Sequence, residues 1–124
     1  MDVETFQFGT EVSNVQEDLV RCNLKVLTLI ESFSKAECHE DMEKLNSDIR
    51  EILDLMRKGI QNLRDLALRQ VNAQQCVMLK TDANSHEEQM TSCLATFKRA
   101  NLACISRLNS VGREKLMSKV KESF

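Results

Sequence analysis

The segment VSNVQEDLVRCNLKVLTLIESF, residues 12–33, carries a regular row of apolar side chains. The row consists of Val12, Val15, Leu19, Cys22, Val26, Leu29 and Phe33. Its steps alternate between three and four residues, which keeps all of these side chains on one face of an α-helix. The spacing therefore predicts a helix over residues 11–33 that packs along this face, with Leu19 and Cys22 in the core.

A second row with the same spacing follows in residues 42–66. It consists of Met42, Leu45, Ile49, Ile52, Met56, Leu63 and Leu66. Gly59 occupies the one position of this row that has no side chain. Leu53 and Ile60 widen the stripe, as expected for a helix that contacts two neighbours. We expect a helix over residues 37–79 with Ile49 and Ile52 in the core, although residues 68–80 fit it only with a slip of register.

The third apolar row lies in QMTSCLATFKRANLACISRL, residues 89–108, and includes Met90, Cys93, Phe97 and Cys104. Eleven residues are close to three helical turns, so Cys93 and Cys104 share a face but stand about 16 Å apart along the axis. At that separation, they cannot share a metal ion or a disulfide within one helix. Because free cysteine behaves as a small apolar side chain, we expect all four residues in the core.

Two short segments predict where helices begin. Ser34 to Glu37 and Ser85 to Glu88 both fit a capping box, in which a serine and a glutamate satisfy each other's exposed backbone amides. Gly112 is placed to end the third helix as a C-cap. The third helix is therefore expected over residues 86–111.

Together these patterns predict an all-α fold, an antiparallel up-down-up three-helix bundle. The bundle is expected over residues 11–111, with helices at about 11–33, 37–79 and 86–111. Residues 1–10 would form a flexible N-terminal arm, and residues 112–124 would form a linker.

The composition supports a helical domain and excludes several functions. The 124 residues contain no proline and three glycines, with 42% hydrophobic and 29% charged residues. A net charge of −2 and few aromatic residues give no reason to expect nucleic acid as a partner. Five cysteines without a CxxC pair, and no signal-like start, indicate a reduced, cytosolic setting. No apolar run approaches the roughly 20 residues that span a bilayer.

Candidate catalytic and metal sites are weak. Cys38, His39, Glu40 and Asp41 form a potential ligand cluster, but no second ligand pair follows at a zinc-like spacing. His86 could serve as a base for a cysteine nucleophile, yet the sequence shows neither an orienting group nor a cleft. The three glycines are isolated, so no phosphate-binding loop is present. We therefore expect no enzyme activity, no metal and no cofactor.

The segment Lys98-Arg99-Ala100-Asn101 is the best candidate for binding a partner. Charge pairs such as Lys98 and Arg99 are usually solvated, but Asn101 falls at the edge of the apolar row. A buried amide there must find a hydrogen-bond partner, which can fix the register of the helices or meet another protein. We predict Lys98, Arg99 and Asn101 as partner-binding residues, with Phe97 as the floor beneath them.

The residues His86-Glu-Glu-Gln89-Met90, followed by the segment from Phe97 to Leu102, resemble a family pattern. The pattern is H-x-x-Q-M, then an aromatic residue, two basic residues and A-N-L, and it occurs in the N-terminal domain of the Sec-twenty family. Leu45-Asn46 also looks similar, so the resemblance covers about residues 21–108. These proteins are Qb-type SNAREs of the endoplasmic reticulum (ER) with an N-terminal helical domain, a SNARE motif and a C-terminal membrane anchor.

The resemblance implies a non-enzymatic module on the cytosolic face of the ER membrane. Such a module docks onto a subunit of an ER vesicle-tethering complex in Golgi-to-ER retrograde transport, and other SNAREs bind through regions that this chain lacks. A groove between two helices of the bundle could receive an amphipathic helix of the tether. Two alternatives remain open: a cysteine-bearing redox or metal-dependent protein, and a self-associating structural coiled coil.

Overall fold

The computed structural model describes residues 3–123 of the chain, and the surroundings of side chains over residues 7–117. Within residues 3–123 it contains three α-helices and no strand: α1 (Val3–Glu31), α2 (His39–Leu68) and α3 (Ala73–Ser123). A short 3-10 helix, η1 (Ser32–Lys35), follows α1. The predicted all-α class is therefore confirmed.

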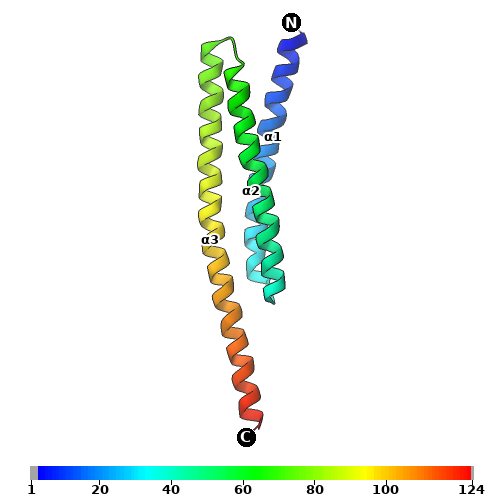
Figure 1. Ribbon diagram of the computed structural model, residues 1–124, viewed down its shortest axis with the longest axis vertical. Helices are drawn as coiled ribbons and strands as arrows, with labels where there is room; N and C mark the ends of the chain where they lie inside the picture. Colours follow the sequence, from blue (N-terminus) through cyan, green and yellow to red (C-terminus); the bar gives the residue numbers. More distant parts are fainter. Residues whose placement is uncertain (1–2, 124) are drawn as a thin grey trace.

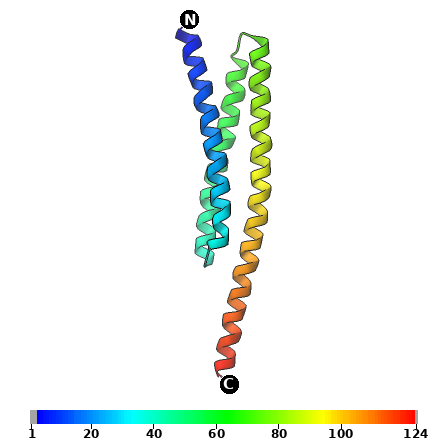
Figure 2. The same cartoon turned by 180° about the vertical axis from the view of Figure 1, so that it is seen from behind.

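The three helices lie side by side in the middle of the molecule (Figure 1). The N-terminus of α1 and the connection between α2 and α3 lie at one end of the molecule, and η1 lies nearer the other. At the first end α1 leans away from α2 and α3 in both views (Figures 1 and 2). At the other end α3 continues well past η1 and the start of α2.

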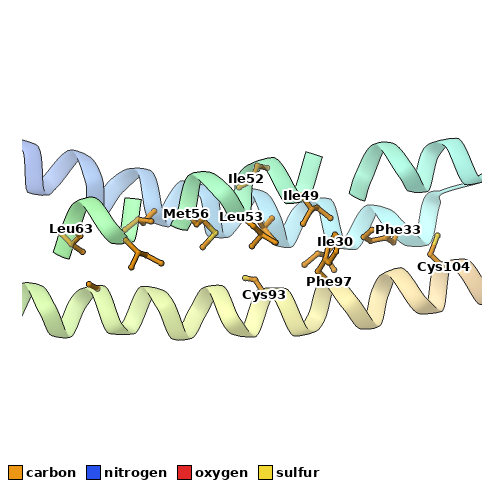
Figure 3. Packing of buried hydrophobic residues seen from close by; sticks show 14 of the residues in the cluster. Ile30, Phe33, Ile49, Ile52, Leu53, Met56, Leu63, Cys93, Phe97 and Cys104 are labelled. Carbon is orange, nitrogen blue, oxygen red and sulfur yellow. The ribbon is translucent and has the colours of Figure 1, made fainter. Parts of the chain in front are cut away.

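The core forms where the apolar rows of the three helices meet (Figure 3). Side chains from α1 and η1 buried there are Leu19, Val26, Ile30 and Phe33. Those from α2 are Met42, Ile49, Ile52, Leu53, Met56, Ile60, Leu63, Leu66 and Ala67. Those from α3 are Leu79, Ala83, Cys93, Phe97, Cys104 and Leu108. Met90 and Cys22, which were expected in the core, are half-buried at its edge.

Two contacts fix the end of the core near η1. The Phe33 and Phe97 rings meet edge to face with their centroids 6.0 Å apart. Arg107 of α3 donates hydrogen bonds from Nη2 to the carbonyl oxygens of Phe33, at 2.9 Å, and Ala36, at 2.7 Å. A helix leaves its last carbonyl groups without intrahelical partners, and Arg107 satisfies two carbonyls just beyond α1.

The boundary between α1 and α2 differs from the predicted capping box. The Ser34 hydroxyl donates to the Glu31 carbonyl at 2.9 Å, so it belongs to the end of the preceding helix. The Glu37 amide instead donates to the Asp41 carboxylate at 3.0 Å, and α2 begins at His39 after the extended residue Cys38. The predicted start at residue 37 is thus corrected by two residues.

The second predicted boundary is wrong by a larger margin. Helix α2 ends at Leu68, not at residue 79, and α3 already begins at Ala73, not at residue 86. Asn72 caps α3, because its Oδ1 accepts hydrogen bonds from the amides of Gln74 and Gln75 at 2.9 and 3.3 Å. This turn explains the slip of register that residues 68–80 required.

The outer segments are helical as well. Helix α1 begins at Val3, within the predicted flexible arm, and α3 passes through Gly112 to Ser123, although a C-cap was expected at Gly112. No glycine among the described residues has the positive φ that such a cap requires. Met1, Asp2 and Phe124 lie outside the described residues. The division into an arm, a bundle and a linker stays a prediction.

Gly59 sets how closely α1 and α2 approach each other. A Cβ atom added at Gly59 would lie 2.8 Å from Cδ2 and 3.3 Å from Cγ of Leu19, which is almost completely buried. Gly59, the one position of the second apolar row without a side chain, is therefore the position where Leu19 of α1 packs against α2.

We expect Gly59→Ala to destabilise the protein, although alanine is favoured over glycine in a helix by about 1 kcal/mol. Crowding Leu19 should cost about 1–3 kcal/mol and outweigh that gain. In a Leu19→Ala background the space is free, so the same substitution should become neutral or stabilising. Urea unfolding of all four proteins measures this coupling.

Gly9→Ala is the matched control, because a Cβ at Gly9 meets nothing within 4 Å. It should not destabilise either background. A stabilising Gly59→Ala in the wild-type background would show that Leu19 and Gly59 are not in tight contact.

Candidate protein-interaction surfaces

The three predicted partner-binding residues of α3 do not lie on one face. Lys98 and Arg99 are exposed, whereas Asn101 is half-buried. The Asn101 Oδ1 atom is shielded from solvent and has no hydrogen-bond partner among the described residues. Because two residues turn a helix by about 200°, Arg99 and Asn101 point to opposite flanks of α3.

Contacts between the helices show which flank faces which neighbour. Arg64 of α2 contacts Glu87 at 2.6 Å and Asn84 at 3.2 Å, so these residues mark the α2 side of α3. Asn101 follows Glu87 by fourteen residues, close to four turns, and therefore lies on the same side. Asn101 is thus a residue of the α2–α3 contact.

Arg99 lies on the opposite flank of α3. Cys93 faces α1, because its thiol donates to Asn23 Oδ1 at 3.0 Å. Thr96 is one turn further on and lies on the side of Cys93 that is turned away from α2. Arg99 donates from Nη2 to Thr96 Oγ1 at 3.2 Å, so its guanidinium lies on the outer side of α3, next to Thr96.

Helix α1 exposes apolar side chains toward the same side of the molecule. Val20, Leu24 and Leu27 are 51%, 59% and 39% exposed and are spaced by four and three residues. Val20 and Leu27 each follow a residue that contacts α3, Gln16 and Asn23, by four positions. We call the surface made by Val20, Leu24, Leu27, Thr96 and Arg99 the α1–α3 face.

Sequence reasoning missed the α1 part of this face. The sequence contains a second apolar row, Val20, Leu24 and Leu27, which runs parallel to the core row of residues 12–33 and indicates this part of the face. A contiguous apolar row that stays exposed is typical of a surface that binds another protein.

A separate groove runs between α1 and α2, with a volume of about 510 Å³. It is lined by Val15, Asp18, Leu19, Arg21, Cys22, Lys25, Ile52, Leu55, Gly59 and Asn62. Burial raises the pKa of the Cys22 thiol, and the nearby Asp18 carboxylate raises it further, so the thiol stays neutral. The lining residues give the groove an apolar floor and charged residues on one rim. We call it the α1–α2 groove.

A larger cleft, of about 880 Å³, lies where α1 leans away from the α2–α3 connection. Arg69 crosses it, with its guanidinium 5.9 Å from the Phe8 ring centroid and 3.7 Å from the Glu11 carboxylate. Cation–π contacts of this kind contribute about 0.5–1 kcal/mol at exposed sites. Arg69 thereby links the end of α2 to the second and third turns of α1.

The cysteines and the histidine that were candidates for catalysis or metal binding lie in different environments. Cys93 and Cys104 are buried, and Cys38 is exposed before α2. Among the described residues, no three of His, Cys, Asp or Glu are close enough together to hold a metal ion. His86, the candidate base, hydrogen-bonds through Nε2 to Gln16 Oε1 of α1.

Gln16 and His86 belong to a polar bridge between α1 and α3. The Gln16 amide nitrogen donates to the Asp82 carboxylate at 3.0 Å, so one glutamine joins two residues of α3. Burial lowers the pKa of His86, and the nearby Asp82 carboxylate opposes this shift without reversing it. Burial at this position therefore favours a neutral imidazole.

The described part of the chain is thus an all-α protein that presents helical surfaces. Human "Vesicle transport protein SEC20" is 26% identical to this chain over 104 residues. The match covers 82% of this chain and 45% of the human protein, so the chain spans less than half the length of that relative. The predicted resemblance to the Sec-twenty family is confirmed by this similarity.

No protein-family model and no solved structure matches the chain. None of the helices over residues 3–123 is both long enough and apolar enough to cross a membrane.

The burial of His86 predicts a loss of stability in mild acid. An unfolded chain protonates His86 near the ordinary pKa of about 6.5, whereas the folded protein does so only at lower pH. The stabilising contribution is therefore complete above that value and is lost as the pH falls through the lowered pKa of the folded state. Urea unfolding at several pH values between 7.5 and 5 should show this decrease, and His86→Gln should reduce it.

His39→Gln is the control, because His39 is the other histidine and is exposed at the start of α2. Its pH dependence should match that of the wild type. An undiminished pH dependence in His86→Gln would place the titrating group elsewhere.

Proposed function

We propose that this chain is the N-terminal interaction module of an ER SNARE, which recruits the SNARE to a vesicle-tethering complex in Golgi-to-ER retrograde transport. The similarity to a human vesicle transport protein supports this role. In this proposal the module lies on the cytosolic face of the ER membrane, has no enzyme activity and needs no cofactor. Other SNAREs would bind a SNARE motif of the kind that the family carries.

The folded unit of this module would be an antiparallel up-down-up bundle over residues 11–111. Residues 112–124 would then connect the bundle to the rest of the SNARE. The helical continuation of α3 past the core supports such a connection, because a continuous helix transmits the position of the bundle more rigidly than a flexible linker does.

The observation that carries the docking proposal is the α1–α3 face. An amphipathic helix of the tether could lay its apolar side chains against Val20, Leu24 and Leu27. Arg99 on the adjacent flank could pair with a carboxylate of that helix, and exposed arginines are frequent among residues that dominate binding energy. Lys98 and Asn101 would contribute if the partner also covers the α2–α3 flank.

Self-association through the same apolar row is the second candidate. The row is flanked by Glu17 and Glu31, three residues before Val20 and four after Leu27. When two copies of the row pair in parallel, Glu31 faces Glu31 of the other copy, and like charges repel. The charges therefore favour a different partner over a second copy.

We expect Leu24→Ser and Arg99→Ala each to weaken binding to the purified tethering complex at least several-fold, because both remove side chains of the α1–α3 face. Both residues are exposed, so the melting temperature should change little. Titration of the labelled domain with the complex gives the dissociation constants, and circular dichroism gives the melting temperatures.

Leu102→Ser is the matched control, since Leu102 is 66% exposed and points away from α1. It should bind like the wild type. Lys98→Ala tests the other flank of α3. Unchanged binding by Leu24→Ser and Arg99→Ala, together with weaker binding by Lys98→Ala, would move the docking surface to the α2–α3 flank.

A further inference from the structure

The α1–α2 groove has the features of a second, independent docking site. Its floor is apolar and is made by Leu19 and Cys22 of α1 and by Ile52 of α2. Gly59 adds no side chain to the floor, so the groove stays open where Leu19 packs against α2. This lining does not overlap the α1–α3 face, which lies on the other flank of α1.

Leu55 forms an exposed wall of the groove. In α2 the large apolar side chains that remain exposed are Leu55, at 53%, and Leu68, at 70%. Leu68 is the last residue of the helix, whereas Leu55 lies in its middle and beside an apolar floor. A leucine in this position gains a buried environment only when another molecule covers the groove.

The rim of the groove carries an unpaired positive charge. Its charged residues are Asp18, Arg21 and Lys25, all from α1. Arg21 contacts the carboxylates of Asp18 at 3.2 Å and Glu17 at 3.8 Å. Lys25 makes no ion pair with any residue that the structure describes, and the α2 wall supplies only the neutral amide of Asn62. The free charge of the rim is therefore the Lys25 ammonium group.

We propose that the α1–α2 groove binds an acidic amphipathic helix of a partner protein. The groove extends from Val15 to Lys25, which corresponds to about 15 Å, or close to three turns of a bound helix. Apolar side chains at positions i, i+4 and i+7 of that helix fill the floor against Leu55, and a carboxylate on its flank pairs with Lys25. The module would then hold two partners on opposite flanks of α1.

Two synthetic 15-residue helical peptides test this proposal. Both carry leucine at i, i+4 and i+7, and they differ only in having glutamate or lysine along the flank next to that row. Fluorescence anisotropy should show that the glutamate peptide binds at least several-fold more tightly than the lysine peptide. Lys25→Glu should reverse this preference, while Lys80→Glu, an exposed lysine on α3, should leave it unchanged.

Leu55→Ser should weaken binding of the glutamate peptide at least several-fold, and Leu68→Ser should have no effect. All of these measurements are made in a Leu24→Ser background, because the glutamate peptide has the same chemistry as the helix proposed for the α1–α3 face, and this substitution keeps the result independent of docking there. Equal affinity for both peptides, or unaltered binding by Leu55→Ser, would overturn the proposal. The proposal would also be overturned if sedimentation gave an apparent mass that rises with protein concentration for the wild type but not for Leu55→Ser. A second copy of the chain would then occupy the groove.

Discussion

The close packing of Leu19 against Gly59 determines how α1 and α2 are joined. Because Gly59 has no Cβ, the backbone of α2 can approach a leucine that is almost completely buried. The contact holds the core row of α1 against α2 and leaves the second apolar row of α1 facing away from α2. Exposed apolar residues on α1 are therefore a consequence of this packing and need not reflect an incomplete core.

Helix α3 completes the core, but it is attached to its two neighbours by different contacts. Phe97 and other apolar residues of α3 pack against α1 and α2, with Phe97 beside Ile30 of α1 (Figure 3), and polar side chains add further contacts between α1 and α3. These polar contacts include the hydrogen bonds of Gln16 with His86 and of Asn23 with Cys93. Polar contacts of this kind add modest stability each, but they fix the register between the helices.

Arg107 marks the end of the folded core on α3. It bonds two carbonyl groups near η1, and after Leu108 the described residues of α3 up to Met117 are exposed. The position of the helix beyond the core is thus set by contacts that end at this point.

The apolar rows could be predicted from the sequence because burial imposes a spacing of three and four residues on any packed helix. The helix ends were harder to predict, because several side chains compete for the same backbone groups. Ser34 satisfies the helix before it, and Asn72 caps a helix that the sequence appeared to start at Ser85. Ser85 to Glu88 fits a capping box, yet nothing in residues 73–85 breaks a helix.

The candidate site was predicted only in part. Arg99 and Asn101 are close in sequence, but helical geometry places them on opposite flanks, and only the position of α2 shows which flank is covered. The exposed row at Val20, Leu24 and Leu27 was visible in the sequence as apolar residues. Its exposure could not be inferred, because a row of this kind is equally suited to contact a third helix.

Native-state amide hydrogen exchange tests most directly whether the contact between α1 and α2 organises the fold. Amides of α1 from Leu19 to Val26 and amides of α2 from Ile52 to Leu63 should share one high free energy of opening. Amides of α3 beyond Leu108 should open at a much lower free energy. Independent opening of the α1 amides at low free energy, while α2 and α3 stay protected together, would show that this contact does not organise the fold.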